Sequence, residues 1–278
     1  MQIISNLPEY RSLLQRWRAE GLRTALVPTM GALHAGHMAL ASYARGHADK
    51  VVMSVFVNPT QFGPNEDFDR YPRTLEADAA LAKAHGVDAI WAPDVATMYP
   101  QGFATSVHVV KLGDGLCGAH RPGHFDGVAT VVSKLLLQAM PDIACFGEKD
   151  FQQLAIIKRM VTDLDIPVAI HGVPIVREDD GLALSSRNRY LSAPERDIAP
   201  MLHSILNHVA DDLRAKEPVT QTLNHAGDML LDAGFASVDY IAYVDSYSLL
   251  PLERFTAGGR LLVAAYLGKT RLIDNIEV

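Results

Sequence analysis

The first 175 residues alternate short apolar runs with helix-like amphipathic segments, and this alternation constrains the fold more than any other feature of the chain. The apolar runs predict strands, and the segments between them predict helices. Strands and helices that alternate with short connections are typical of a parallel sheet covered by helices on both faces. The predicted strands are 22–28, 51–57, 89–92, 143–146 and 168–173, and the predicted helices are 37–48, 74–84, 125–139 and 151–164.

The pattern changes after Val176. Two polar-faced helices are predicted at 194–215 and 219–233, followed by strands at 237–244 and 260–267. Runs of helices and then strands, without strict alternation, indicate an α+β arrangement. We therefore expect an α/β protein with a Rossmann-like parallel-sheet domain at residues 1–175 and a smaller C-terminal α+β domain at residues 176–278.

Composition excludes several classes of protein. The net charge of −7 argues against a broad nucleic-acid-binding surface, although a few local cations can still bind one nucleotide. No apolar run reaches the roughly 20 residues that span a bilayer, and the N-terminal residues lack a signal-peptide pattern. The two cysteines, Cys117 and Cys145, form no CxxC pair, so neither a zinc cage nor a disulfide framework is expected. A cytoplasmic protein fits these features best.

The strongest local motif is the run PTMGALHAGH at residues 28–37, between the first predicted strand and the first predicted helix. A helix N-terminus at such a point presents amide groups and a positive dipole end to phosphate. His34 and His37 can donate hydrogen bonds to phosphate oxygens. A plain glycine turn with two surface histidines is the alternative, and a zinc site is weaker because no HExxH pattern or third ligand is evident. The motif resembles the HIGH motif of the nucleotidylyltransferase superfamily.

Polar residues also follow other predicted strands. Asn58 and Gln61 follow the second strand, where neutral amides would suit a substrate with hydroxyl groups. After the strand at 143–146, Lys149 could offset phosphate charge and Asp150 could accept from ribose hydroxyls. His124 precedes a predicted helix. Each of these residues could also be an ordinary turn or capping residue.

The run GLALSSRN at residues 181–188 opens the second predicted domain. Two hydroxyls beside an arginine make a compact clamp for phosphate, although polar turns of this kind are common. At this place in the chain the run resembles the KMSKS loop, which closes over ATP in the same superfamily.

Together these segments resemble the pantoate–β-alanine ligase family, within the HIGH-motif nucleotidylyltransferase superfamily. The resemblance covers essentially the whole chain and includes the runs RYPRT at 70–74, GVPI at 172–175 and RLIDN at 271–275. Leu184 stands where some members carry methionine, and another apolar residue should preserve that packing.

The resemblance implies specific roles for the residues of these motifs. His37 is the expected proton donor, with His34 and Lys149 as further catalytic residues. Gln61 and Gln153 would bind pantoate, and Gln61 also neighbours the β-alanine site. No protein ligand to a metal is expected. The expected ATP-binding residues are Met30, Gly31, Ala32, Leu33, His34, Ala35, Gly36, His37, Gly147, Glu148, Lys149, Asp150, Val176, Leu184, Ser185, Ser186 and Arg187.

The resemblance also implies a reaction. (R)-pantoate would be activated by ATP as a pantoyl-adenylate, and β-alanine would displace AMP to give pantothenate, a coenzyme A precursor. Mg²⁺ should accompany ATP, bound mainly through phosphates and water. The family further implies a homodimer, with the C-terminal domain acting as a lid.

Three other functions share part of the motif set. A nucleotidylyltransferase acting on a phosphorylated substrate shares the first motif and would leave a dinucleotide-like product. An aminoacyl-tRNA synthetase shares two motifs, but this chain is short and acidic, with no evident tRNA-binding domain. A nucleotide-sensing module without activity is disfavoured by the intact His34, His37, Lys149 and Ser185–Arg187.

Overall fold

A computed structural model describes residues 1–64 and 66–278. These residues form two compact units, which are Met1–Asp114, Arg121–Glu148 and Gln153–Pro174 (unit 1) and Gly115–His120, Lys149–Gln152 and Ile175–Val278 (unit 2). The domain division predicted at residues 175 and 176 stays a prediction. The long segment of unit 2 begins at Ile175, and two short segments from earlier in the chain belong to the same unit.

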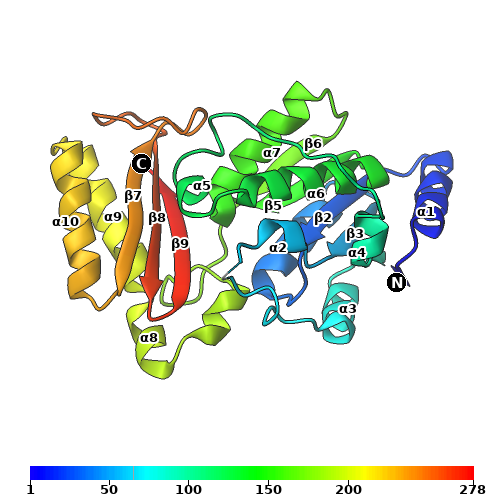
Figure 1. The fold of residues 1–278 in the computed structure, drawn as a ribbon, viewed down its shortest axis with the longest axis horizontal. Coiled ribbons are helices and arrows are strands. Elements are labelled where there is room, and N and C mark those ends of the chain that lie inside the picture. Colours follow the sequence, from blue (N-terminus) through cyan, green and yellow to red (C-terminus); the bar gives the residue numbers. More distant parts are fainter. Residues whose placement is uncertain (65) are drawn as a thin grey trace. The chain divides into compact units, whose positions relative to one another are not determined.

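Unit 1 contains the predicted parallel sheet. Its six strands lie in the order β1-β4-β3-β2-β5-β6, and every pair that is hydrogen-bonded is parallel (Figure 1). The strands are β1 (Gln2–Ile4), β2 (Thr24–Thr29), β3 (Lys50–Val55), β4 (Ala89–Trp91), β5 (Ile143–Gly147) and β6 (Ala169–Val173). The strands after β1 are those that the sequence predicts, with ends that differ from the prediction by at most two residues.

Helices cover both faces of this sheet. Side chains alternate between the faces along a strand, so Leu26 of β2 packs into one core cluster and its neighbours Ala25 and Val27 pack into another. The first cluster is covered by α1, α6 and α7, and the second by α2 and α3 (Figure 1). These helices are α1 (Leu7–Ala19), α2 (Ala35–Arg45), α3 (Leu75–Ala84), α6 (His124–Ala139) and α7 (Phe151–Asp163). The short helix α4 spans Val95–Met98.

Unit 2 is built on an antiparallel sheet in the order β7-β8-β9. Its core packs one face of the sheet against α9 and α10 (Figure 1). The elements are α5 (Cys117–His120), α8 (Ala193–Ile198), α9 (Met201–Arg214), α10 (Val219–Asp232), β7 (Ser237–Val244), β8 (Arg260–Leu267) and β9 (Thr270–Glu277). The predicted class, a parallel α/β domain with a smaller α+β domain, is therefore confirmed.

Several elements differ from the sequence prediction. The single helix predicted at 194–215 is two helices, because Pro200 has no N–H for an interior helical hydrogen bond and sits at the N-cap of α9. The elements β1, α1 and β9 are absent from the prediction. For α1 the signal exists, since Tyr10, Leu13, Leu14 and Trp17 are buried at helical spacing. In β9 two buried polar residues interrupt the apolar alternation on which strand prediction depends.

Both cysteines, Cys117 and Cys145, are free and buried. Burial raises the pKa of the Cys145 thiol to about 12. Within the described residues, no helix combines the length and the apolar character needed to cross a membrane.

Candidate active site

The predicted site residues of unit 1 follow three adjacent strands. The strands β2, β3 and β5 are neighbours in the sheet and parallel, so their carboxyl ends lie at one edge. The strand order reverses between β2 and β5, which is the position where open α/β sheets bind ligands. Residues 30–37 follow β2, Asn58 and Gln61 follow β3, and Gly147 and Glu148 lie at the end of β5.

His34 and His37 cap the N-terminus of α2. The Nδ1 atom of His34 accepts from the amide of Gly36 (3.2 Å), and Nδ1 of His37 accepts from the amide of His34 (3.3 Å). The two rings stack at a tilt, with centroids 4.1 Å apart. An Nδ1 atom that accepts a hydrogen bond carries no proton in a neutral imidazole, so each ring has its N–H on Nε2. The cap therefore orients both histidines and fixes which nitrogen can donate.

A buried carboxylate shapes the loop before this helix. Asp78 of α3 is 3% exposed, and its two oxygens accept from the amides of Ala32 (3.0 Å) and Leu33 (2.8 Å). Gly31 has φ +84°, and a Cβ there would lie 3.0 Å from the Asp78 carboxylate, so this position requires glycine. Asp78 is absent from the residues predicted from sequence. The available signal was an acidic residue on the inward face of the predicted helix 74–84.

Asn58 organises the segment that carries Gln61. It is 1% exposed, and its amide nitrogen donates to Gln61 Oε1 (3.0 Å) and to the carbonyl of Gly127 (3.2 Å). Its Oδ1 accepts from the Tyr99 hydroxyl (2.7 Å). The Gln61 amide nitrogen in turn lies 3.2 Å from Met30 Sδ. The structure therefore brings together two regions that the sequence predicts separately, the loop after β2 and the 3₁₀ turn η1 (Pro59–Gln61).

The main chain of Gln61 is held from α6. His124 Nδ1 lies 2.8 Å from the Gln61 carbonyl and Arg121 Nη1 lies 3.0 Å from His124 Nε2, so the proton of a neutral His124 is on Nδ1. Arg121 also forms a bidentate pair with Glu66. Burial raises the pKa of Glu66, but the hydrogen bond and charge of Arg121 outweigh burial, and the pKa ends below its ordinary value. His124 is thus a positioning residue for Gln61, and Arg121 and Glu66 are partners that the sequence prediction does not include.

Two adjacent glutamines have different surroundings. Gln152 is 4% exposed, and its side chain accepts from the amide of Cys117 (3.0 Å) and donates to the carbonyl of Gly115 (2.8 Å), all within unit 2. Gln153 belongs to unit 1 and its side chain is half-buried. Gln152 therefore holds the main chain at 115–117, and the assignment of Gln153 to pantoate stays a prediction.

The remaining predicted residues lie in unit 2 on two segments. Lys149 and Asp150 belong to the short 3₁₀ turn η2 (Glu148–Asp150), whose first residue is in unit 1. Val176 and Leu184 face each other across a turn, with the Leu184 amide donating to the Val176 carbonyl (3.0 Å). Ser185 follows and caps the 3₁₀ helix η3 (Ser186–Tyr190), its hydroxyl accepting from the amide of Arg187 (3.2 Å).

The ion pairs beside this turn tie down the acidic run that precedes it. Arg196 of α8 donates to both Glu178 (2.7 Å) and Asp180 (2.6 Å). Among residues 1–64 and 66–278, no group of three or more histidine, cysteine, aspartate or glutamate side chains is placed to hold a metal ion. The zinc interpretation of the His34–His37 pair therefore gains no support.

Comparisons with known proteins agree with one another. A family model described as pantoate–β-alanine ligase matches residues 2–277. A pantothenate synthetase from Paramagnetospirillum magneticum is 58% identical over 278 residues, covering 100% of this chain and 98% of the relative. One from Rhodospirillum rubrum is 55% identical over 279 residues, covering 100% and 99%.

Solved structures give the same result. The crystal structure of pantothenate synthetase from Thermus thermophilus has a TM-score of 0.94 and 49% identity, and covers 100% of this chain and 99% of that one. The crystal structure of pantoate–β-alanine ligase from Francisella tularensis, complexed with β,γ-ATP and β-alanine, has a TM-score of 0.84 and 34% identity, covering 100% and 97%.

Proposed function

The chain belongs to the pantoate–β-alanine ligase family, and from this premise we infer that it is an ATP-dependent ligase that condenses (R)-pantoate with β-alanine to give pantothenate. The observation that carries the inference is the Francisella tularensis relative, which spans the whole of this chain and is complexed with β,γ-ATP and β-alanine. The three other functions that share part of the motif set have no comparable support.

We propose that the reaction proceeds through a pantoyl-adenylate. A carboxylate is a poor acyl donor because its leaving group would be oxide. When a pantoate carboxylate oxygen attacks the α-phosphorus of ATP, a P–O bond forms and the bond to the β-phosphate breaks, releasing pyrophosphate. The β-alanine amine then attacks the acyl carbon, loses a proton and displaces AMP. No covalent bond to the enzyme is required, so positioning and electrostatic stabilisation carry the catalysis.

The capped histidines support the assignment of the phosphate chemistry. His34 and His37 each carry the N–H on Nε2, because each Nδ1 accepts from a backbone amide. Both stand at the N-terminus of α2, where the helix dipole favours negative charge. We propose that His37 is the proton donor to the phosphate oxygens and that His34 and Lys149 stabilise the charge on the departing pyrophosphate. ATP would also contact Met30–Leu33, Ala35, Gly36, Gly147, Glu148, Asp150, Val176 and Leu184–Arg187.

Gln61 and Gln153 are the proposed pantoate residues, with Gln61 also beside β-alanine. Amide groups can donate to the substrate carboxylate and accept from its hydroxyls. Support comes from the way in which Gln61 is fixed. Its Oε1 accepts from Asn58, its Nε2 contacts Met30, and its carbonyl is contacted by His124. A residue held at both its side chain and its main chain can be preorganised for a substrate.

Mg²⁺ would enter with ATP as part of the substrate complex, held by phosphate oxygens and water. Mg²⁺ commonly keeps several waters and binds through substrate phosphates in this way. We also propose a homodimer in the cytoplasm, as the family implies, with small molecules and not nucleic acid or membrane as its partners.

The proposed order of chemistry predicts two separable half-reactions. With ATP, Mg²⁺ and pantoate alone, about one equivalent of pyrophosphate per active site should be released, because an enclosed site shields the adenylate from water. Labelled pyrophosphate should then exchange into ATP without β-alanine. Adding β-alanine should release AMP and pantothenate, each identified by mass spectrometry.

Other products would contradict the mechanism. ADP and inorganic phosphate would indicate an acyl-phosphate intermediate instead of an adenylate. Pyrophosphate that appears only after β-alanine is added would rule out a separate adenylation step. Exchange that proceeds without pantoate would contradict the assignment of pantoate as the group that is activated.

A further inference from the structure

Asp274 and Asn275 are adjacent polar residues in the middle of β9, and both are almost fully buried, with 3% and 2% exposure. They belong to the RLIDN run at 271–275, to which the proposed chemistry assigns no role. Buried polar residues in a strand are costly unless they are hydrogen-bonded. Successive side chains of a strand point to opposite faces of the sheet, and the two residues contact different parts of unit 2: Asp274 pairs with Arg177, and Asn275 donates to the carbonyl of Lys149.

Asp274 holds the turn that leads to Ser185–Arg187. Arg177 donates to both carboxylate oxygens, at 2.7 and 2.9 Å, and the same guanidinium donates to the carbonyl of Gly181 (3.0 Å) at the tip of the turn. Arg177 also pairs with Ala183 in an isolated bridge. Asp274 thereby fixes the base and the tip of the turn through one arginine.

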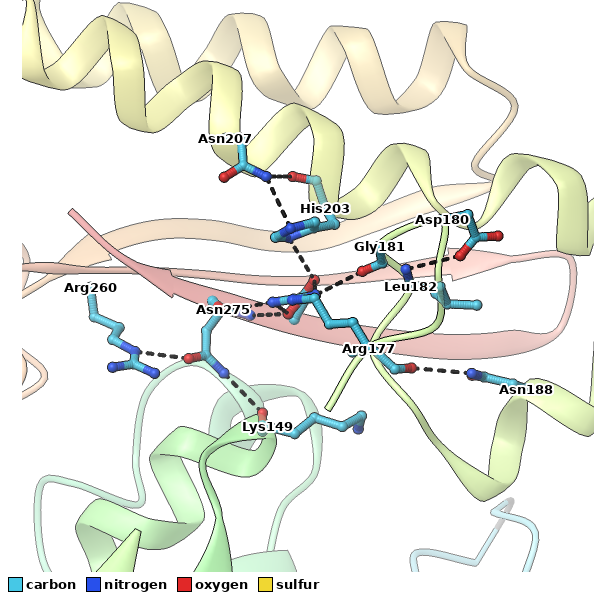
Figure 2. Close-up of polar contacts among 12 residues, drawn as sticks. Lys149, Arg177, Asp180, Gly181, Leu182, Asn188, His203, Asn207, Arg260 and Asn275 are labelled. Carbon is cyan, nitrogen blue, oxygen red and sulfur yellow. Dashed lines mark hydrogen bonds and ion pairs between the residues drawn. The ribbon is translucent and has the colours of Figure 1, made fainter. Parts of the chain in front are cut away.

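A second element supports the same carboxylate. His203 of α9 has its Nδ1 3.5 Å from Asp274 Oδ2, and its Nε2 lies 3.1 Å from the amide nitrogen of Asn207 (Figure 2). An Nε2 that accepts from Asn207 leaves the proton on Nδ1, facing Asp274. A Cβ at Gly181, where φ is +94°, would lie 2.9 Å from the His203 ring, so the turn packs closely on this histidine.

Asn275 holds the other segment. Its amide nitrogen donates to the main-chain carbonyl of Lys149 (3.0 Å), and its Oδ1 accepts from Arg260 Nε (2.8 Å). Because Arg260 can only donate, it fixes which end of the Asn275 amide faces Lys149. The Arg260 guanidinium lies 4.1 Å from the centroid of the Phe151 ring, two residues after Lys149. In Figure 2 the Lys149 side chain extends away from the contact with Asn275.

We propose that Asp274 and Asn275 are positioning residues for ATP: Asp274 sets the segment that carries Ser185–Arg187, and Asn275 sets the main chain of Lys149. The proposal rests on the proposed function for the roles of those segments. Two adjacent residues of one strand fix two segments that lie far apart in the sequence. β9 is the sheet neighbour of β8 along its whole length, so the pair is anchored on a rigid element.

The test uses Asn275→Asp and Asp274→Asn in the full-length protein. Asn275→Asp keeps the size of the side chain and the acceptor for Arg260, but places a carboxylate oxygen against the Lys149 carbonyl. A displacement of about 1 Å at a catalytic group costs up to about 100-fold in rate, so pantoate-dependent exchange of pyrophosphate into ATP should fall about 10–100-fold. The KM for ATP should rise, while the KM for pantoate stays at its wild-type value. Asp274→Asn should likewise raise the KM for ATP and leave the KM for pantoate at its wild-type value.

A second readout does not depend on activity. Amide hydrogen exchange should accelerate in peptides covering 149–152 for Asn275→Asp, and in peptides covering 177–188 for Asp274→Asn. The control is Leu230→Ala in α10, a residue that is 1% exposed in the core of unit 2. This variant should lower the melting temperature and leave both Michaelis constants unchanged.

Three outcomes would overturn the proposal: wild-type rates of pyrophosphate exchange into ATP in both variants, equal rises in the KM for ATP and the KM for pantoate, or amide hydrogen exchange that accelerates equally in both segments in each variant. Failure of the proposed function would look different. In that case the wild-type protein itself would not exchange pyrophosphate into ATP in the presence of pantoate.

Discussion

His37 uses its two ring nitrogens for two purposes. Nδ1 accepts from the amide of His34 and closes the N-terminal cap of α2, while Nε2 keeps the N–H that the proposed chemistry requires. An alanine at this position would remove the cap and the donor together. Loss of a helix cap alone costs about 0.5–2 kcal/mol. The two roles must therefore be separated before any loss of activity is assigned to catalysis.

The variants His37→Asn and His37→Gln make this separation. Asparagine keeps an acceptor near the position of Nδ1 and has no donor near Nε2, whereas glutamine can place a donor near Nε2. We expect His37→Asn to unfold at the wild-type temperature but to form the adenylate about 100–1000-fold more slowly. His37→Gln should recover part of that rate. Single-turnover measurements of pyrophosphate release give the rate of adenylate formation in each variant. A wild-type rate in His37→Asn would remove His37 from the mechanism.

The adjacent glutamines offer a matched comparison. Gln153→Ala should raise the KM for pantoate more than the KM for ATP, because its amide is predicted to contact the pantoate hydroxyls. Gln152→Ala should instead lower stability, since it leaves the buried Cys117 amide without its acceptor and removes one of the two donors to the Gly115 carbonyl. Steady-state kinetics and thermal melting distinguish the two effects. A selective loss of ATP affinity in Gln153→Ala would contradict the assignment.

At the scale of elements, close packing decides where the Gln61 segment lies. Gly127 in the first turns of α6 faces η1, and a Cβ there would stand 2.4 Å from the carbonyl oxygen of Thr60. Only glycine allows this approach of helix and turn. The carbonyl of Gly127 also accepts from Asn58, which in turn holds Gln61. The position of the Gln61 amide therefore depends on the absence of one methyl group in α6.

We therefore expect Gly127→Ala to destabilise unit 1 by about 1–3 kcal/mol, the usual cost of overpacking, and to raise the KM for pantoate. Gly227→Ala in α10 is the control, since nothing lies within 4 Å of a Cβ built there. Alanine should stabilise that helix by about 0.5–1 kcal/mol. Chemical denaturation measures both effects. A Gly127→Ala protein with wild-type stability would mean that η1 can move away without cost.

At the scale of the whole molecule, the two units have separate cores, and their stabilities can be followed separately. Both tryptophans, Trp17 and Trp91, belong to unit 1, so their fluorescence reports on that unit. Unit 2 must be followed by circular dichroism or hydrogen exchange. Because two units need not unfold together, a single melting temperature is insufficient for this protein.

The acid stability of unit 2 should depend on Asp274. Burial raises its pKa, but the close contact with the His203 ring, whose Nδ1 lies 3.5 Å from Oδ2, and the hydrogen bonds and charge of Arg177 outweigh burial, and the folded-state pKa lies below the ordinary value. A depressed pKa contributes stability above the unfolded-state value of about 3.9, and that contribution is lost as the pH falls through the lower folded-state pKa.

Asp274→Asn should therefore lower the free energy of unfolding of unit 2 by up to about 3–5 kcal/mol at pH 7, as expected when one partner of a buried ion pair is removed. The difference from wild type should shrink below about pH 4, where the Asp274 carboxylate of the unfolded wild-type chain begins to take up a proton while the folded-state carboxylate stays charged. Urea denaturation of both proteins, followed by circular dichroism at several pH values between roughly pH 3 and pH 7, measures this difference in unfolding free energy. A difference that does not change over this range would contradict the assignment.

The sequence by itself determined the features that are written locally. The alternation of apolar runs and amphipathic segments predicted the parallel sheet, and the glycine- and histidine-rich run before α2 predicted a ligand-binding loop after β2. Both depend on residues within one or two turns of one another, where periodicity and capping chemistry act directly. The amides after β3 made Gln61 a candidate in the same way, but its assignment to pantoate came from the family resemblance.

The tertiary structure alone decided which residues support these segments. Asp78 holds the amides of Ala32 and Leu33 from 45 or more positions away, and Asn275 holds Lys149 across 126 positions. Their side chains are polar and buried, so in the sequence they only interrupt an apolar pattern, as in β9. A buried polar group is stable only with its partner, and that partner is chosen by chain folding and not by neighbours in the sequence.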